Sequence, residues 1–123
     1  MTELPRVLII DDDLHFRQAL EVIIGDKGFQ PIPVPTGEQA LEIVSEQDIQ
    51  IALIDLRLHA MDGLDVLQGI RERSPYTECI LLTAHASRSS AIAAANQGAY
   101  SYIEKPFEMD ELLLTIRRAE EKR

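Results

Sequence analysis

The sequence predicts an α/β fold in which five parallel strands alternate with five helices. Short apolar runs recur along the chain, and each is followed by a segment whose apolar residues have helical spacing. This alternation is typical of a parallel sheet with helices on both faces. With 123 residues the chain has the length of one ordinary domain, so we expect residues 1–123 to form a single unit. Residues 117–123 are either the start of a linker or a solvated helix end.

The five strands are predicted where short runs rich in β-branched and other apolar residues end in turn-forming or acidic residues. The first of them, residues 6–10, is apolar from Val7 to Ile10, as expected of a strand buried on both faces. In chain order the predicted strands are 6–10, 30–34, 49–54, 79–83 and 100–104.

The five helices are predicted from apolar stripes and end signals. Gly25 or Gly28 is expected to close the first helix, Thr36 to cap the second, and Gly98 to follow the alanine-rich fourth. In chain order the predicted helices are 14–24, 36–44, 63–72, 87–96 and 108–121. The stripes that we expect to be buried are Phe16, Leu20, Ile23 and Ile24; Ala40, Leu41 and Val44; Leu64, Leu67 and Ile70; and Met109, Leu112, Leu113 and Ile116.

Three prolines predict the position of the second strand. Pro31, Pro33 and Pro35 occupy alternate positions, so the missing N–H donors all lie on one side of that strand. Such a side is tolerated at the edge of a sheet. An edge position for strand two fits the flavodoxin-like, doubly wound (βα)5 three-layer sandwich with strand order 2-1-3-4-5. The alternative is an irregular proline-rich loop, in which Ile32 and Val34 would bury nothing.

Composition excludes several classes of function. The formal charge of −9 argues against direct nucleic-acid binding by this domain, because such binding depends largely on neutralising phosphates. No apolar stretch approaches the roughly 20 residues of a membrane span, and the N-terminus lacks the pattern of a signal peptide. Cys79 is the only cysteine and lies in an apolar run, which predicts a buried thiol and a cytoplasmic location.

Acidic residues follow the predicted first and third strands. Asp11, Asp12 and Asp13 follow strand one, and Asp55 follows strand three. In the order 2-1-3-4-5 these strands flank the point where ligands bind in open parallel sheets. Strand four adds Thr83, and strand five leads into Lys105. A carboxylate cluster of this kind favours Mg²⁺, and Asp55 can act as an oxygen nucleophile toward phosphorus.

Each of these residues also has an ordinary structural explanation. Asp13 and Asp62 precede predicted helices and are better explained as helix caps than as metal ligands. Thr83 alone would be a strand-end residue, and Lys105 alone a solvated charge. Only their convergence from different strand ends indicates a site.

The order of the motifs resembles a known family. Ile10-Asp11-Asp12, Asp55 followed by Met61-Asp62-Gly63, Leu82-Thr83-Ala84, Gly98-Ala99 and Lys105-Pro106-Phe107 occur in sequence over about the whole chain. Together they are similar to the receiver domain of bacterial two-component response regulators.

The resemblance implies that Asp55 is the phosphoacceptor of a signalling switch rather than the nucleophile of an enzyme. It implies that Asp12 holds Mg²⁺ directly, Asp11 through water, and Arg57 through its backbone carbonyl. The phosphodonor would be a sensor histidine kinase or a phosphotransfer protein.

It further implies that Thr83 and Lys105 contact the phosphoryl oxygens and that Tyr102 is the aromatic switch residue. Phosphorylation would then change the surface of the fourth helix, fifth strand and fifth helix, where the off-stripe Leu114 hints at a homodimer or partner surface. An ordinary exposed leucine is the alternative.

The chain departs from the family after Asp55. A proline is usual where His59 stands, and its loss should loosen this loop. The side chains of Arg57 and His85 should either overhang the phosphoryl site or point to solvent.

Two other functions compete with the switch. A haloacid-dehalogenase-type phosphatase also uses Asp, Thr and Lys. Such enzymes, however, are expected to carry an Asp-x-Asp pattern on the first strand and to have a cap domain. This chain has its candidate nucleophile on strand three and no room for a cap. A degenerate receiver that binds a partner without phosphorylation is disfavoured because the site residues are all present.

Overall fold

The computed structural model describes residues 3–58 and 60–122, and it contains the predicted alternation of strands and helices. The strands are β1 (Arg6–Ile10), β2 (Gln30–Val34), β3 (Ile51–Asp55), β4 (Glu78–Thr83) and β5 (Ser101–Glu104). The helices are α1 (Leu14–Asp26), α2 (Gly37–Glu46), α3 (Gly63–Arg73), α4 (Arg88–Asn96) and α5 (Met109–Lys122). The predicted ends agree with these bounds to within two residues.

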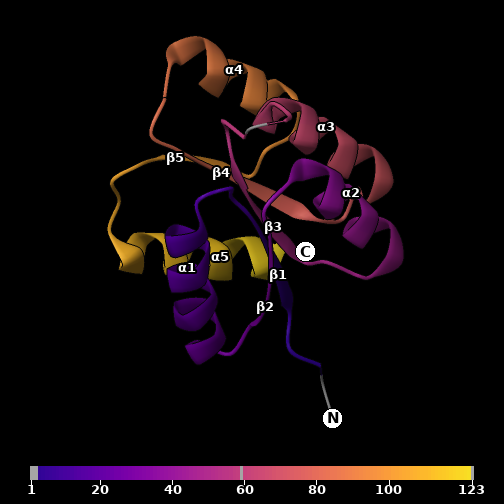
Figure 1. Cartoon of the computed structure of the whole chain (residues 1–123), viewed down its shortest axis with the longest axis vertical. Helices are drawn as coiled ribbons and strands as arrows, with labels where there is room; N and C mark the ends of the chain where they lie inside the picture. Colours follow the sequence, from indigo (N-terminus) through magenta and orange to yellow (C-terminus); the bar gives the residue numbers. More distant parts are fainter. Residues whose placement is uncertain (1–2, 59, 123) are drawn as a thin grey trace.

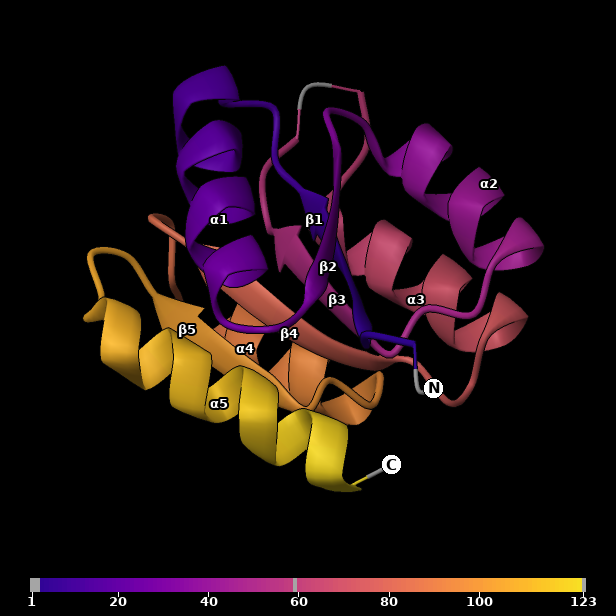
Figure 2. The ribbon, with the colours of Figure 1, turned by 90° about the horizontal axis from the view of Figure 1, so that it is seen from below.

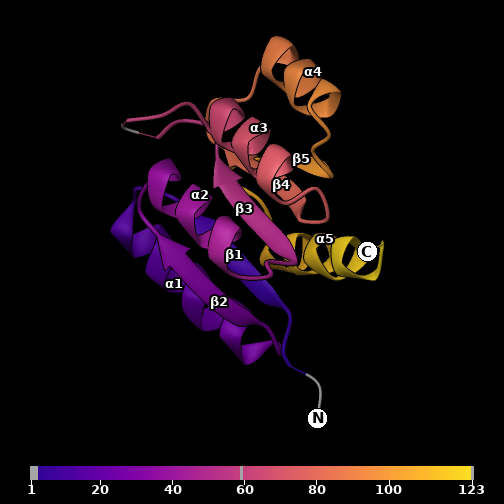
Figure 3. The same ribbon diagram turned by 90° about the vertical axis from the view of Figure 1, so that its right-hand side faces the viewer.

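The five strands form one parallel sheet in the order β2-β1-β3-β4-β5, which confirms the predicted topology (Figure 3). In β2, the N–H of Gln30 donates to the Pro5 carbonyl, and the Val34 carbonyl accepts from the N–H of Asp11. Gln30 and Val34 therefore face β1, and the prolines at 31 and 33 face away from it. The proline-rich segment is an edge strand and not an irregular loop.

Helices cover both faces of the sheet, α1 and α5 one face, and α2, α3 and α4 the other (Figures 1 and 2). Alternate residues of each central strand serve opposite layers. Leu8 and Ile10 of β1 pack in the core beneath α2, α3 and α4, whereas Val7 and Ile9 pack beneath α1 and α5. Both faces of the central strands are buried, so the site can open only at a strand end.

The end of α1 differs slightly from the prediction. The helix continues through Gly25 to Asp26, and the residue with left-handed backbone is Gly28, at φ 91°. An added Cβ at Gly25 would meet only Pro31 side-chain atoms at 3.7 and 3.8 Å, so this glycine has no steric reason to end the helix. Gly28 adopts the conformation that a glycine stop provides.

The expected burial of Cys79 is confirmed, whereas Phe16, Ile23, Leu41, Leu64 and Met109 of the predicted stripes are only partly buried. Cys79 is fully buried in β4, and burial raises the pKa of its thiol to about 12. Within residues 3–58 and 60–122, no helix has both the length and the apolar character needed to cross a bilayer.

Candidate functional site

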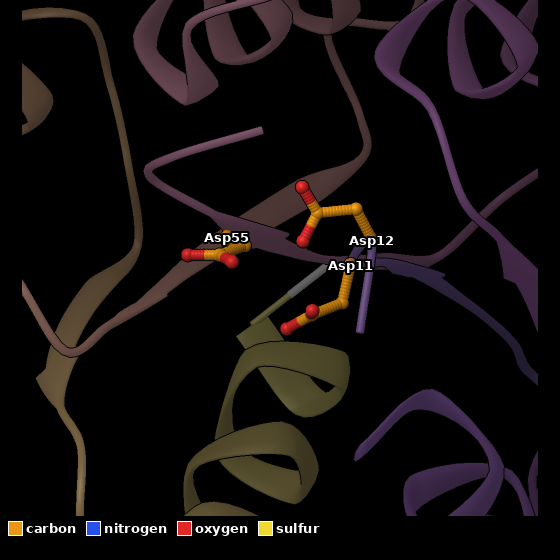
Figure 4. A group of neighbouring side chains, drawn as sticks. All are labelled: Asp11, Asp12 and Asp55. Carbon is orange, nitrogen blue, oxygen red and sulfur yellow. The ribbon is translucent and has the colours of Figure 1, made fainter. Parts of the chain in front are cut away.

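Three carboxylates meet at the carboxyl end of the sheet. Asp11 and Asp12 directly follow β1, and Asp55 is the last residue of β3. The register pairs Ile10 with Ile54, which places the residues that follow side by side. Each of the three side chains offers an oxygen, and these oxygens all lie within 4.8 Å of one another. Figure 4 shows the three side chains projecting from the neighbouring ends of these strands.

Asp11 is held from three directions. Its side chain is nearly buried, and its Oδ1 accepts a hydrogen bond from the N–H of Asp13 at 2.9 Å. Its Oδ2 accepts from Lys105 Nζ at 3.1 Å, and its backbone carbonyl accepts from Arg17 Nη1 at 2.7 Å. The contacts from Asp13 and Lys105 fix the carboxylate and offset part of the cost of burying its charge, and the contact from Arg17 holds the backbone.

Lys105 reaches the acidic cluster from the end of the edge strand β5. It follows β5, and its N–H donates to the Thr83 carbonyl at 2.8 Å, so the two strand ends are joined by a backbone bond. The peptide bond between Lys105 and Pro106 is cis. The ammonium also lies 4.1 Å from the centroid of the Phe16 ring. The apolar spacing places Phe16 in the core stripe of the first helix and does not predict this contact.

Asp55 is half-buried, and its surroundings disfavour its charged form. Burial is the largest cause that raises the pKa of its carboxyl above the usual value, and the charges of Asp11 and Asp12 raise it further. The Lys105 ammonium and the Arg57 N–H, which donates to Asp55 Oδ1 at 3.3 Å, lower it in part. Burial therefore outweighs the stabilisation of the charged form by Lys105 and the Arg57 N–H.

The loop after β3 depends on a close approach to Asp55. The N–H of Gly63 donates to the Leu56 carbonyl at 2.8 Å, and Arg57 forms an isolated bridge with Asp62. A Cβ added to Gly63 would lie 2.3 Å from the Asp55 carbonyl oxygen, and no side chain could be accommodated without moving backbone. The sequence places Gly63 in a motif and at the start of the third helix, but it does not predict this close approach.

Two aspartates that were interpreted as caps are confirmed as caps. The Asp13 side chain accepts from the N–H groups of His15 and Phe16 at the start of α1. The Asp62 side chain accepts from the N–H of Leu64 at the start of α3.

Arg57 follows β3 and His85 follows β4. Arg57 and His85 are both exposed, and where their side chains lie relative to the phosphoryl site stays a prediction. His59 lies outside the described residues, so the predicted loosening of the loop stays a prediction.

Thr83 lies at the end of the neighbouring strand β4. Asp55 pairs with Leu82 in the sheet, so Thr83 is one residue beyond the position beside the candidate nucleophile. Its side chain is fully buried, and Oγ1 accepts from the N–H of His85 at 2.9 Å. The strand ends therefore place Thr83 and Lys105 on the same rim as the acids.

Tyr102 connects β5 to α4. Its ring is partly buried, and its hydroxyl lies 2.6 Å from Ser90 Oγ. The hydroxyl also accepts from the N–H of Ser87, the residue that caps α4, at 3.3 Å. This aromatic side chain therefore links the fifth strand to the first turn of the fourth helix.

The donor atoms of the cluster fit a hard divalent cation. All three are carboxylate oxygens, which is the ligand type that Mg²⁺ prefers, and their mutual repulsion is the cost that such a cation relieves. Burial is the main cause that raises the pKa of Asp55, and the charges of Asp11 and Asp12 add to it. Asp11, Asp12 and Asp55 are thus the candidate metal ligands of the described chain.

Comparisons with known proteins agree with this geometry. Residues 7–117 match the family model described as the response regulator receiver domain. The "Putative response regulator NtrX-like" of Rickettsia bellii is 38% identical over 115 residues, covering 92% of this chain and 24% of that protein. The "Regulatory protein AtoC" of Escherichia coli is 35% identical over 119 residues, covering 97% of this chain and 26% of that protein. The chain thus spans about a quarter of these relatives.

Solved structures of similar chains have the same fold. A CheY-like receiver domain protein from Methanospirillum hungatei superposes with a TM-score of 0.95 at 28% identity, covering 98% of this chain and 96% of that one. The beryllofluoride-activated NtrC4 receiver domain dimer superposes with a TM-score of 0.90 at 32% identity, covering 95% and 97%. With its strand order, its acidic rim and these matches, the chain belongs to the response regulator receiver domain family of two-component signalling.

Proposed function

We propose that this domain is a phosphorylatable signalling switch in which Asp55 accepts a phosphoryl group from a sensor histidine kinase or a phosphotransfer protein. The observation that carries the proposal is the position of Asp55 at the end of β3. There it lies beside Asp11 and Asp12 and interacts electrostatically with the Lys105 ammonium. Its chemistry would be limited to its own phosphorylation and dephosphorylation.

In this proposal Mg²⁺ is held by the carboxylates of Asp11, Asp12 and Asp55 and by the backbone carbonyl of Arg57. When bound, it would neutralise charge on the acids and on the phosphoryl oxygens. Asp11 is already held by Lys105, Asp13 and Arg17, so it needs little reorganisation to act as an outer ligand. Asp12 is partly exposed, which suits a direct ligand.

Asp55 would attack phosphorus through one carboxylate oxygen, forming an oxygen–phosphorus bond as the bond to the donor nitrogen breaks. The Lys105 ammonium and the Thr83 hydroxyl would contact the oxygens of the transferred group. Lys105 has three N–H donors and uses one on Asp11, so it can serve the phosphoryl group without releasing that carboxylate.

The signal would leave the site through Thr83 and Tyr102. When the Thr83 hydroxyl turns from the His85 N–H toward the phosphoryl group, the packing behind it would change. The hydrogen bond between the Tyr102 hydroxyl and Ser90 Oγ would then have to lengthen or break. The surface of α4, β5 and α5 would then change by a shift between two packings.

That same surface is the proposed site of homodimerisation. Leu114 of α5 is 48% exposed and Ile92 of α4 is 51% exposed, so both helices leave apolar area uncovered. The NtrC4 receiver domain, described as a dimer, is a structural neighbour that supports this.

The chain's place in a longer protein is also a proposal. The relatives are about four times longer than the part they share with this chain, and some are named DNA-binding transcriptional regulators. We propose that residues 1–123 are one receiver unit, with residues 117–123 leading into a linker. The unit itself carries a charge of −9, so contact with nucleic acid would belong to another part of the protein.

Intact mass after incubation with acetyl phosphate and Mg²⁺ tests the function. We expect one added phosphate that is absent from Asp55→Asn and retained in Asp26→Asn, which removes an exposed carboxylate at the end of α1. Release of many phosphates per chain would point to the phosphatase alternative. A wild-type protein that gains no mass would leave only the unphosphorylated binding module.

The exposed Arg57 side chain lies two residues after Asp55 and is proposed to alter the lifetime of the aspartyl phosphate. It would do so by pairing with the phosphate or with a carboxylate of the rim. The dephosphorylation rate of Arg57→Ala, followed by intact mass, tests this, and a rate equal to that of the wild type would refute it.

A further inference from the structure

We propose that Phe16 is a positioning residue for phosphorylation, because its ring and the Asp11 carboxylate hold the Lys105 ammonium between them at the rim of the acidic site. This inference rests on the proposed role of Lys105 in contacting the phosphoryl group. It gives a role to a side chain that was expected only to fill the core.

The ammonium has two contacts of different kinds. Lys105 Nζ lies 3.1 Å from Asp11 Oδ2 and 4.1 Å from the centroid of the Phe16 ring. The face of an aromatic ring carries partial negative charge and attracts a cation within about 6 Å. A lysine has four rotatable side-chain bonds, so a single ion pair leaves the head group free to swing about its partner. The ring removes that freedom.

Phe16 is itself held in place from two sides. Its N–H donates to Asp13 Oδ1 at 3.2 Å in the first turn of α1, which fixes the backbone that carries the ring. The ring meets Phe107 edge to face, with centroids 6.3 Å apart and planes at 82°. Phe107 follows Lys105 by two residues, so the segment that delivers the lysine also supports the ring beneath it.

The alternative is that Phe16 only packs in the α1–α5 layer. Removing the ring would then lower stability without changing the surroundings of Lys105. Phe29 provides a matched control, since it is a buried phenylalanine of the same layer whose ring lies near Arg117 rather than Lys105. Phe16 also borders an apolar pocket with Phe107 and Met109 that a kinase could touch, so the test uses a small phosphodonor and no partner protein.

The first measurement is NMR of the lysine side chains in unphosphorylated protein. The chain has only three lysines, Lys27, Lys105 and Lys122, so their ε-methylene signals can be assigned. We expect the Lys105 signal to be shifted upfield by the ring in the wild type and in Phe16→Tyr. The shift should disappear in Phe16→Leu and persist in Phe29→Leu. A Lys105 signal unchanged by Phe16→Leu would overturn the proposal.

The second measurement is the rate of phosphorylation by acetyl phosphate and Mg²⁺. We expect Phe16→Leu to slow it about three- to tenfold, the range that loss of a cation–π contact implies. Phe16→Tyr and Phe29→Leu should keep the wild-type rate. An unslowed Phe16→Leu would overturn the positioning role even if the NMR shift is lost.

The two measurements separate the possible failures. If wild-type Asp55 takes up no phosphate although the Lys105 shift is present, the proposed function fails, and the positioning role falls with it while the ring contact stands. If Phe16→Leu does not fold, Phe16→Met removes the ring with a more flexible side chain and allows the same comparison.

Discussion

Replacing Gly63 with alanine should damage the fold and the site together, although it adds only one methyl group. Gly63 is the first residue of α3, and its backbone passes directly over the end of β3. A Cβ at this position would lie 2.3 Å from the Asp55 carbonyl oxygen, 2.6 Å from the Leu56 Cα and 2.9 Å from the Leu56 carbonyl oxygen. All three atoms belong to the backbone, so none can move aside by a rotamer change.

The magnitude follows from these contacts. Overpacking in a well-packed region costs about 1–3 kcal/mol, and a backbone obstacle places this change in the upper half of that range. Alanine is favoured over glycine by up to about 1 kcal/mol in a helix interior, but the first helical position makes fewer helical bonds and gains less. We expect a net loss of about 2 kcal/mol in the free energy of unfolding.

Urea unfolding at equilibrium, followed by circular dichroism, measures this loss, and Gly25→Ala is the control. Gly25 lies within α1, and an added Cβ there would make only ordinary contacts with the Pro31 side chain. That variant should gain about 0.4–1 kcal/mol, because alanine restricts the unfolded chain and favours the helix. The two glycine-to-alanine changes should therefore have opposite signs.

The same substitution should also displace the Asp55 backbone and lower its phosphorylation by acetyl phosphate. If Gly63→Ala matched Gly25→Ala in both stability and phosphorylation, the close approach would have no energetic importance. The steric argument for a glycine at this position would then be wrong.

Three further predictions concern titration, metal and thiol chemistry. Burial raises the pKa of Asp55 above its ordinary value of 3.8. Between that value and the folded pKa, the native protein keeps a proton that the unfolded chain has lost. The free energy of unfolding therefore falls as the pH rises from about 3.8 through the folded pKa. In metal-free buffer Asp55→Asn should thus have a higher free energy of unfolding than the wild type at pH 7, and this difference should shrink toward pH 3.8. A difference in urea unfolding that stayed constant over this range would contradict the reasoning. Mg²⁺ at a hundredfold excess over its Kd should stabilise the wild type by about 2.7 kcal/mol in thermal melts, but not Asp12→Asn; equal gains would remove Asp12 from the ligand set. Because the Cys79 thiol is buried with a pKa of about 12, a thiol reagent at pH 8 should label it only in urea, and rapid labelling of native protein would show that β4 opens.

The arrangement of the sheet could be predicted from sequence because it depends on local chemistry. Prolines at alternate positions remove donors from one side of a strand whatever else surrounds it, so Pro31, Pro33 and Pro35 indicated an edge. Once β2 was at the edge, the doubly wound order brought Asp11 and Asp55 to neighbouring strand ends. The caps at Asp13 and Asp62 were predictable for the same reason, since their bonds span only two or three residues.

Contacts between distant residues could not be predicted in this way. Periodicity showed that Phe16 faces inward, but not that Lys105, 89 positions later, lies over its ring. Arg17 was unremarked in the sequence, and only the folded backbone shows that it donates to the Asp11 carbonyl. The importance of Gly63 depends on a distance between two backbone segments, which no pattern in one sequence specifies.

The proline edge also limits how copies of this domain can assemble. Along Pro31 and Pro33 the outer rim of β2 presents carbonyl acceptors without N–H donors, so a strand from another molecule could form only part of a ladder there. At the other rim of the sheet that the structure describes lies β5, four residues long. A complete backbone ladder between copies would have to use β5 on both molecules. A contact that uses the same rim of each molecule closes at two and cannot propagate into a fibre.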